Sequence, residues 1–496
     1  MMALAARDLP LARAILAEAI RVPADHVERD ARCGLSNHEG PRLEYLKRRI
    51  VEIGAVRAPE DVFFDSFGNL VWQIEDPDDP TPAEQKRVIW FDGHTDTVQA
   101  LRGAWRSKIG GVDAYDGRVD GDIDRDFLRR ELGWLPADDQ WDHLLFGRGS
   151  ADQLGGVVAQ IVASRILVEL TAEGALRGCV VRCYGTVAEE DNDGGGPHHV
   201  LHHELPELPP WKVPDVVVLT EGTGDAKKGS LGIYRGQRGR MQIEVEITGR
   251  SCHGSMPWEG LNPLEHGALI LVEATARYGR GEGFLEDAFL GPGSRTASWA
   301  SLDTPSDCAV PERFTFRFDR RLTLGETAEA ALADVEGMGS VEAARAAGLT
   351  VDVRVPIYET PTWTGTVPGN AQVYPGWATP ADHPAIDAAV RTYRRVVSPT
   401  IPADGSMGNL RPEPRVDRWI FSTDGVGFPV PVAAPPFAVP AEKGWVRAGD
   451  VTYPPMFGVG PGVEQNTHKI GECVDLRELE RTVGFLARFP SVFAAR

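Results

Sequence analysis

The chain has 496 residues, of which 42% are hydrophobic and 25% are charged, a composition typical of globular proteins with two or three domains. Its formal net charge of -20 argues against nucleic acid as a partner, because phosphate backbones are bound by basic surfaces. We find no run of about 18 apolar residues, so we expect no membrane span and take the cytoplasm as the default location.

The first half of the chain predicts alternating helices and buried strands. Residues 1–56 indicate helices, and apolar runs at 62–64 and 70–72 around a Gly-containing turn predict a hairpin. Buried strands at 88–91, 179–187 and 216–220, with an apolar helix at 155–170, complete this pattern. The order predicts an α/β fold, a mixed sheet with helices on both faces, in which ligands bind at the carboxyl ends of strands.

After residue 221 the pattern changes to the alternation of half-exposed antiparallel strands, at 241–247 and 314–318. Helices are predicted at 264–278, from Glu326, and near the end of the chain at 477–488. We therefore expect an inserted α+β domain at 232–352 within a larger catalytic domain formed by 1–231 and 353–496. The segments 103–146 and 428–455 are expected to be insertions in the larger domain.

Three polar side chains follow or precede buried segments at positions suited to a metal site. His94 and Glu190 come just after strand runs, and Asp152 opens the helix at 155–170. Each has a structural alternative: a turn histidine, a solvated acidic turn, or a helix N-cap. Histidine and carboxylate ligands suit hard or borderline divalent metals, and the ordered set, with His468 late in the chain, favours a metal centre.

Two further acidic residues fit roles around such a centre. Asp96 lies two positions after His94, so on extended backbone both side chains share a face and Asp96 can orient the ring. Glu189 adjoins Glu190, and repulsion between close carboxylates raises the pKa of one of them toward the range of a general base.

In the content and order of these motifs the chain resembles the two-metal hydrolases that include acetylornithine deacetylase, succinyl-diaminopimelate desuccinylase, aminoacylase and carboxypeptidase G. The resemblance implies a zinc-exopeptidase-like catalytic domain with Glu189 as general base and a cis peptide bond between Asp152 and Gln153. It also implies two divalent metal ions, zinc above cobalt or manganese, with Asp152 as the bridge. The ligands would be His94, Asp152 and Glu221 for one ion, and Asp152, Glu190 and His468 for the other.

The inserted domain is similar to the lid and dimerisation domain of the same family. His253, in the segment 251–257, matches a lid histidine that polarises the scissile carbonyl, often across a dimer; the alternative is a surface histidine. Arg321 and Asn262 would contact the substrate or support the lid. The resemblance therefore implies a homodimer formed through the lid.

Within the family, the segments 234–241, 319–323 and 421–423 are most similar to hydrolases linked to selenium metabolism. The chain departs from the peptidase branch at Leu154, where that branch commonly has Lys, and at 308–311, where an Asn is absent. We therefore expect a metal-dependent amidohydrolase or deacylase that cleaves a C–N bond of a small molecule. The alternatives are a dipeptidase or carboxypeptidase-type metallopeptidase, and a catalytically silent protein that binds metal or a small molecule.

Overall fold

The computed structural model describes residues 1–24, 38–109, 112–118, 123–132, 136–405 and 407–495. Its helices are α1 (Met2–Arg21), α2 (Gly40–Glu52), α3 (Arg102–Lys108), α4 (Arg125–Leu132), α5 (Leu154–Glu169), α6 (Glu189–Asn192), α7 (Gly195–His199), α8 (Pro263–Gly279), α9 (Ala328–Glu336), α10 (Gly339–Ala346), α11 (Pro384–Val396) and α12 (Leu476–Ala494). Its strands are β1 (Val62–Phe64), β2 (Leu70–Glu75), β3 (Arg87–His94), β4 (Leu144–Phe146), β5 (Cys179–Thr186), β6 (Val216–Leu219), β7 (Ile233–Gln237), β8 (Gly239–Thr248), β9 (Cys252–His253), β10 (Glu286–Asp287), β11 (Gly291–Pro292), β12 (Ser294–Asp303), β13 (Ala309–Val310), β14 (Arg313–Leu322), β15 (Thr350–Arg354), β16 (Val373–Tyr374), β17 (Trp377–Ala378), β18 (Val416–Trp419), β19 (Val430–Pro431), β20 (Val446–Ala448), β21 (Val451–Tyr453), β22 (Met456–Gly458) and β23 (Cys473–Asp475).

Among the described residues, nine strands form the main sheet, in the order β1-β2-β5-β3-β6-β22-β7-β17 with β18 also paired to β7. The central strands β5, β3, β6 and β22 are parallel, and antiparallel strands flank them on both sides. The predicted hairpin is present, with Val62 opposite Trp72. The mixed sheet agrees with the prediction, and its parallel centre brings several strand ends to one edge.

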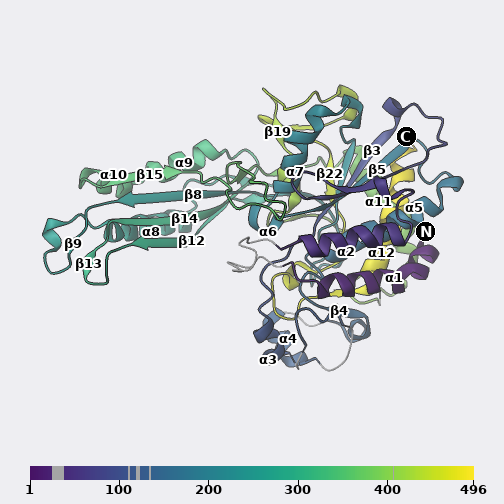
Figure 1. Cartoon of the computed structure of the whole chain (residues 1–496), viewed down its shortest axis with the longest axis horizontal. Helices are drawn as coiled ribbons and strands as arrows, with labels where there is room; N and C mark the ends of the chain where they lie inside the picture. The colour runs from purple at the N-terminus through teal and green to yellow at the C-terminus, as the bar shows by residue number, and fades with distance from the viewer. Residues whose placement is uncertain (25–37, 110–111, 119–122, 133–135, 406, 496) are drawn as a thin grey trace.

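The long helices gather on one face of the main sheet. Helix α5 lies between that face and helices α1 and α12, which explains why it is apolar on all sides (Figure 1). The other face carries shorter helical segments than the first, together with a small sheet. Its aromatic core, which includes Trp90, Tyr184 and Trp419, is covered by the short helical turns at 200–213 and by the small sheet β19-β21-β20. The segment 428–455 thus supplies part of the aromatic core on this second face of the main sheet.

A narrow arm extends from the main body in Figure 1, and we call this part, residues 239–354, the lid. Strands β12, β14, β8 and β15 form its antiparallel sheet, and helices α8, α9 and α10 share an apolar core with that sheet, around Ile243 and Phe316. The inserted α+β lid and dimerisation domain was expected at 232–352. Two elements cross those bounds, because β7 pairs within the main sheet and β16, beyond residue 352, pairs with β8.

The segment 103–146 carries α3 and α4 and has a small apolar core of its own, with Trp105 and Leu128 fully buried. Parts of this insertion lie outside the described residues. Among the helices that the structure describes, none is both long and apolar enough to cross a membrane.

Candidate metal centre and active site

The candidate site lies at the carboxyl ends of three neighbouring parallel strands, β5, β3 and β6. His94 is the last residue of β3, Glu189 begins α6 just after β5, and Glu221 follows β6 by two residues. Because parallel strands end at the same edge, these side chains meet although they are far apart in the chain. Asp152 approaches from the loop before α5, and His468 from the loop between β22 and β23.

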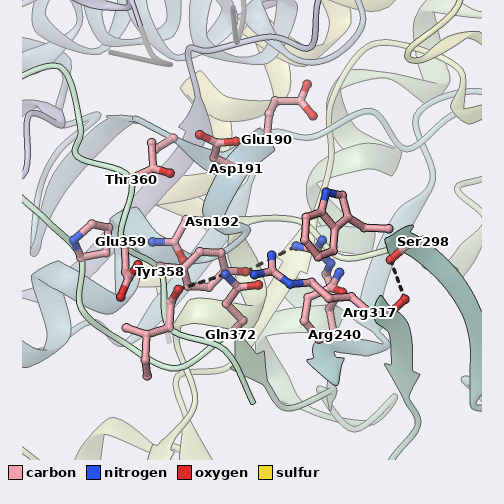
Figure 2. Close-up of a pocket in the computed structure, with 15 residues that line it drawn as sticks. Glu190, Asp191, Asn192, Arg240, Ser298, Arg317, Tyr358, Glu359, Thr360 and Gln372 are labelled. Atoms are coloured by element: carbon pink, nitrogen blue, oxygen red, sulfur yellow. Dashed lines mark hydrogen bonds between the residues drawn. The ribbon is translucent and has the colours of Figure 1, made fainter. Parts of the chain in front are cut away.

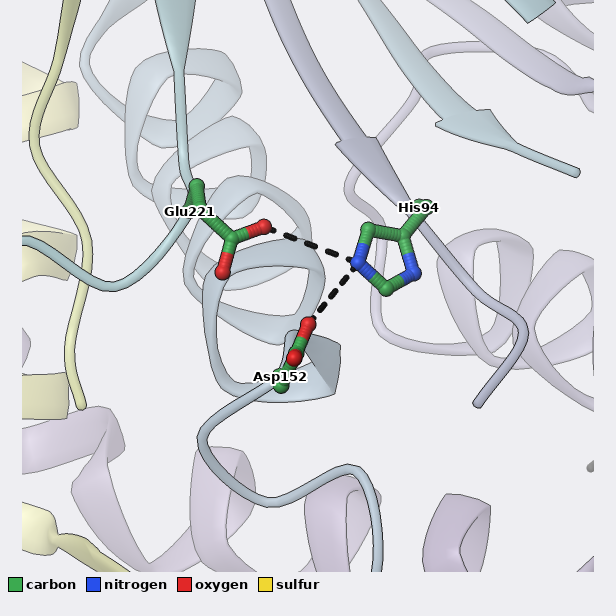
Figure 3. A group of neighbouring side chains, drawn as sticks. All are labelled: His94, Asp152 and Glu221. Carbon is green, nitrogen blue, oxygen red and sulfur yellow. Dashed lines mark hydrogen bonds and ion pairs between the residues drawn. The ribbon is translucent and has the colours of Figure 1, made fainter. Parts of the chain in front are cut away.

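The first group of donors is His94, Asp152 and Glu221, all buried (Figure 3). The Nε2 atom of His94 lies 3.0 Å from Oδ1 of Asp152 and 3.5 Å from Oε2 of Glu221. The peptide bond between Asp152 and Gln153 is cis, as the resemblance implies.

The second group shares Asp152 with the first. The Nε2 atom of His468 lies 3.0 Å from Oδ2 of Asp152 and 3.1 Å from Oε2 of Glu190. Each carboxylate oxygen of Asp152 therefore faces a different histidine. In each group the donor atoms all lie within 4.8 Å of one another.

Several residues fix the orientation of these donors. The carboxylate of Asp96 lies 3.3 Å from Nδ1 of His94, on the side of the ring away from the cluster. The side-chain amide of Gln153 donates to Oε2 of Glu221 at 2.6 Å. Oriented ligands of this kind hold metals more tightly than free side chains do.

Sequence reasoning missed the group that holds the Asp152 loop. The carboxylate of Glu472 accepts hydrogen bonds from the backbone N–H groups of Ala151, at 3.0 Å, and Asp152, at 3.2 Å. Its other oxygen accepts from Nη1 of Arg148 at 2.5 Å, and both side chains are fully buried. Arg148 stands in the Gly-rich segment before Asp152, but nothing in the sequence indicates its partner more than 300 positions away.

The carboxyl groups of the cluster have strongly shifted pKa values. Burial raises the pKa of Glu221 to about 8, and neighbouring carboxylates, Asp152 first among them, add to the effect. Burial likewise raises the pKa values of Glu189 and Glu190. Burial acts in the same direction on Asp152, but its hydrogen bonds with the two histidines outweigh burial and hold its pKa below the usual value.

The pKa values of the two histidines are raised, although burial by itself lowers the pKa of an imidazole. Burial by itself lowers the pKa of His94, but the charge of Glu189 and the contact with Asp152 raise it well above the usual value. For His468 the desolvation is outweighed by Asp152 and Glu190, which raise the pKa to about 12. The cluster as a whole thus concentrates negative charge, which favours the binding of a cation.

This donor set fits divalent metal ions. A bound cation favours charged carboxylates and neutral imidazoles. It therefore takes the place of the protons that raised pKa values would otherwise keep on the carboxylates and histidines of the cluster. Two imidazoles with several carboxylates, one of which presents an oxygen to each group, suit zinc, manganese or cobalt. Glu189 also faces this cluster, with Oε2 at 3.8 Å from Nε2 of His94.

A cleft of about 330 Å³ opens onto the cluster. Its lining also includes Arg240 and Arg321, from the lid strands β8 and β14. Arg321 is held by the carboxylate of Asp319, with Nε to Oδ1 at 2.7 Å, and by the hydroxyl of Ser422, at 2.7 Å. Arg240 contacts Asp319 as well, through Nε at 3.2 Å, and pairs with Asp193. The cleft thus combines an acidic cluster with two arginines that are each paired with a carboxylate, and we call Arg240 and Arg321 its cationic wall.

A second cavity, of about 400 Å³, adjoins the first and shares Glu190 and Arg240 with it. Figure 2 shows Arg317 and Gln372 around this space, together with Tyr358, whose hydroxyl donates to Asp193 at 3.0 Å. The cavity lies between the lid sheet and the main body, so together the two cavities can hold a ligand longer than the metal cluster alone requires.

The structure does not bring the other expected site residues to the cleft of the same chain. His253 forms part of β9, at the far end of the lid from α6 (Figure 1). Asn262 is near it, since Leu261 pairs with Arg250, and its side chain accepts hydrogen bonds from the N–H groups of Leu264 and Glu265. In this structure Asn262 is thus the N-cap of α8, a role that Asn commonly has.

Comparison with known proteins finds relatives of this chain and structures with a similar fold. A model described as a peptidase dimerisation domain matches residues 235–346. The uncharacterized protein YgeY of Escherichia coli strain K12 is 32% identical over 415 residues, which cover 81% of this chain and 85% of that protein. A succinyl-diaminopimelate desuccinylase of Methylobacterium radiotolerans is 26% identical over 264 residues, which cover 53% of this chain and 58% of that enzyme.

Among solved structures, the M20 family metallo-carboxypeptidase Sso-CP2 of Sulfolobus solfataricus has a similar fold, with a TM-score of 0.61, 13% identity, and 97% and 98% of the two chains covered. Human carnosine dipeptidase 1 is similar with a TM-score of 0.59 and 16% identity, over 100% and 98% of the two chains. At these identities the similarity concerns the fold alone.

The chain belongs to the M20 family of metal-dependent hydrolases, which act on amide and peptide C–N bonds. Its mixed sheet with an added dimerisation domain is the architecture of that family.

Proposed function

We propose that this enzyme is an amidohydrolase that uses two divalent metal ions, zinc in the first place, to cleave the amide-type C–N bond of a small molecule. The observation that carries the proposal is the shared carboxylate of Asp152, which faces His94 with one oxygen and His468 with the other. If the site bound a single ion, one of the two donor groups, around His94 or around His468, would have no metal to bind.

In this proposal His94, Asp152 and Glu221 hold one ion, and Asp152, Glu190 and His468 hold the other. When bound, such ions polarise a carbonyl oxygen and lower the pKa of water. Asp96 orients His94 through the ring nitrogen that faces away from the cluster.

Glu189 is the general base of this proposal. Its carboxylate lies in the cleft beside the cluster, and its pKa is raised by burial, which brings it closer to the working pH of an enzyme. Glu189 takes the proton of the attacking water and returns it to the leaving nitrogen as the C–N bond breaks. The same side chain therefore serves as base and then as acid.

The cationic wall indicates a substrate with an anionic group. Arg321 uses Nε, one Nη1 bond and one Nη2 bond for Asp319 and Ser422, so its guanidinium retains donors for a ligand in the cleft. A carboxylate is the group that suits this fork best. We therefore propose an N-acyl or N-carbamoyl compound that carries a carboxylate, bound with this group toward Arg321.

The edge strand β12 supports our proposal of a homodimer through the lid. This strand has ten residues, a length of about 33 Å at about 3.3 Å per residue. Its end at Ser294 pairs with Arg321 beside the cleft, and its other end, at Asp303, lies toward the His253 turn. Two copies paired antiparallel along β12 would bring the His253 turn of each to the cleft of the other.

Exposed apolar side chains on the same part of the lid support this dimer. Leu269 and Val272 of α8 are 59% and 67% exposed, and Trp299 and Leu302 of β12 are 48% and 41% exposed. Helix α8 contacts β12, and Leu302 pairs with Phe314 of the core beneath α8, so Leu302 lies on the same face of the lid sheet as this helix, whereas Trp299 packs against Arg317 on the other face. Large continuous apolar surfaces mark interfaces, and an unpaired edge strand can pair with a second strand.

A cytoplasmic location stays a prediction.

The test is turnover by the variant Glu189→Gln after metal loading. We expect a full complement of metal, measured by mass spectrometry of the bound element, with a loss of at least about 100-fold in kcat. Glu84→Gln, an exposed carboxylate away from the cleft, is the control. Activity within a few-fold of the parent protein would refute the role of Glu189, and bound metal with no hydrolysis in a broad screen would favour a silent binding protein.

A metallopeptidase is the second candidate, because the cavity beyond Arg240 offers space for a longer ligand. Parallel screens of N-acyl amino acids, N-carbamoyl amino acids and dipeptides separate the two. A preference for dipeptides would replace the deacylase proposal while leaving the metal site unchanged.

A further inference from the structure

We infer that Ser255 is a positioning residue that holds the lid histidine, His253, as a neutral ring with its proton on Nε2. In this state His253 presents an N–H donor at the end of the lid. The inference rests on the proposed function, in which this ring acts on the scissile carbonyl in the partner's cleft.

The backbone amide decides the protonation state of the ring. The N–H group of Ser255 donates to Nδ1 of His253 at 3.1 Å. A backbone amide can only donate, so Nδ1 must carry the lone pair. The remaining proton of the neutral ring is then on Nε2. The hydroxyl of Ser255 lies 2.8 Å from the same Nδ1 and also donates to it.

The turn that carries the ring is held firmly. The N–H group of Met256 donates to the carbonyl oxygen of His253 at 2.9 Å, and that of Gly254 donates to Cys308 at 2.7 Å. On the other strand Ala309 pairs with His253. These bonds fix the backbone on both sides of the ring, and the hydroxyl of Ser255 limits its rotation.

The opposite nitrogen is free to act on a ligand. Within the part of the chain that the structure describes, Nε2 of His253 has no hydrogen-bond partner, and the residue is exposed. A base at this place would need its lone pair on Nε2, which the Ser255 amide opposes. The geometry therefore gives His253 the role of a hydrogen-bond donor to a developing oxyanion.

The first experiment reads the ring directly. The dimer is labelled with ¹⁵N-histidine, and two-bond ¹⁵N–¹H correlations are recorded at pH 8, with the His253 signals assigned by their loss in His253→Gln. We expect the pattern of a ring protonated on Nε2. A ring protonated on Nδ1 would overturn the inference, whatever the enzyme's activity.

The second experiment separates donor from base. Glutamine can place an N–H group near the position of Nε2 but cannot act as a base, whereas alanine offers neither. We expect His253→Ala to lose about 100-fold or more in kcat and His253→Gln to lose clearly less, with the pH profile of the parent protein. Equal losses in both variants would refute the donor role.

The third experiment isolates Ser255. Ser255→Ala keeps the backbone donor but frees the ring to rotate, so we expect kcat to fall about 3- to 10-fold with KM and dimer mass unchanged, the scale of one hydrogen bond. Ser255→Thr keeps the hydroxyl and should restore most of the rate. An Ala variant as active as the parent would show that the hydroxyl has no such role.

The outcomes also separate this inference from the proposed function. If His253→Ala retains full activity, the lid histidine takes no part in the reaction and that portion of the proposed function fails. The labelled spectrum would still decide which ring nitrogen of His253 carries the proton, and the same spectrum of Ser255→Ala would show whether the hydroxyl contributes.

Discussion

Asp96 joins the two halves of the candidate metal site, because its carboxylate contacts His94 and also the backbone of the segment that carries Glu190. One oxygen lies 3.3 Å from Nδ1 of His94. The carboxylate also accepts hydrogen bonds from the N–H groups of Glu189, at 3.2 Å, and Glu190, at 3.0 Å. A single side chain thus sets the place of ligands for both proposed ions and of the proposed base.

The first prediction concerns metal affinity. Asp96→Asn replaces one of the two carboxylate oxygens by an amide NH2 group, which cannot accept from the backbone N–H group that faces it, and it removes the charge that favours the imidazole orientation. We expect a 10- to 100-fold weaker binding of the metal, the usual effect of losing such a support. Titration of the metal-free protein with zinc measures it. An unchanged affinity would show that Asp96 is not needed to orient His94.

The second prediction concerns the buried pair of Arg148 and Glu472. Glu472→Gln leaves the guanidinium of Arg148 buried without a charged partner, and we expect a loss of about 3–5 kcal/mol in the free energy of unfolding. The metal-free protein is unfolded in denaturant to measure it. Adding Arg148→Met to the same chain should recover part of the loss. If the double variant is no more stable than Glu472→Gln, the buried charge is not the cause.

The third prediction concerns substrate charge. Arg321→Ala removes the guanidinium at the cleft wall, so we expect KM to rise at least about 10-fold for a substrate with a carboxylate, the scale of one charge-assisted hydrogen bond. An otherwise identical substrate with a neutral amide is the matched control and should be affected little. Equal effects on both substrates would mean that Arg321 supports the fold of the cleft instead.

The fourth prediction concerns the dimer. The double variant Leu269→Glu and Val272→Glu places two charges on the exposed apolar surface of α8 without disturbing buried residues. We expect light scattering to show a monomer, and kcat to fall sharply because the partner's His253 turn is lost. Val416→Glu, on the main body and 41% exposed, is the control. A fully active monomer would contradict the in-trans arrangement.

The fifth prediction concerns pH. Glu478, in the first turn of α12, is buried, and burial raises its pKa to about 7. This pKa is above that of a glutamate in the unfolded chain, which is about 4.3. Protonated Glu478 therefore stabilises the folded protein, and this contribution is fully present below about pH 4.3. The contribution is lost as the pH rises through about 7.

Glu478→Gln is always neutral, and its oxygen can still accept the N–H of Gly462. In thermal melts of the metal-loaded protein we therefore expect the variant to lose less stability than the parent between pH 5.5 and pH 8. The difference should grow by at most about 1.4 kcal/mol per pH unit. Glu329→Gln, on the surface of α9, is the control. Parallel curves for parent and variant would contradict the assignment to Glu478.

The strands that position His94, Glu190 and Glu221 were predictable, because buried parallel strands require continuous apolar runs and the donors follow those runs directly. His468 has no such signal. Its segment ends no long strand, and its place in the site came from the resemblance to a family.

Other features depend on contacts that a sequence pattern does not encode. The pairing of Glu472 with Arg148 joins two segments that meet only when β23 pairs with β4. Helices were predicted on both faces of the main sheet, and the second face carries short ones at 195–212. The small sheet β19-β21-β20 that lies with them was not predicted, because its strands are too short to leave a periodic signal.

His468 follows Glu221, the proposed ligand nearest to it in the sequence, by 247 positions, and this spacing has a consequence for biosynthesis. A ribosome has to synthesise the chain through His468 before the second donor group can assemble, so a product truncated before this residue lacks a ligand for one of the two ions. In this proposal, metal uptake distinguishes chains that include His468 from shorter products, and the ion supply in the cell stabilises the former.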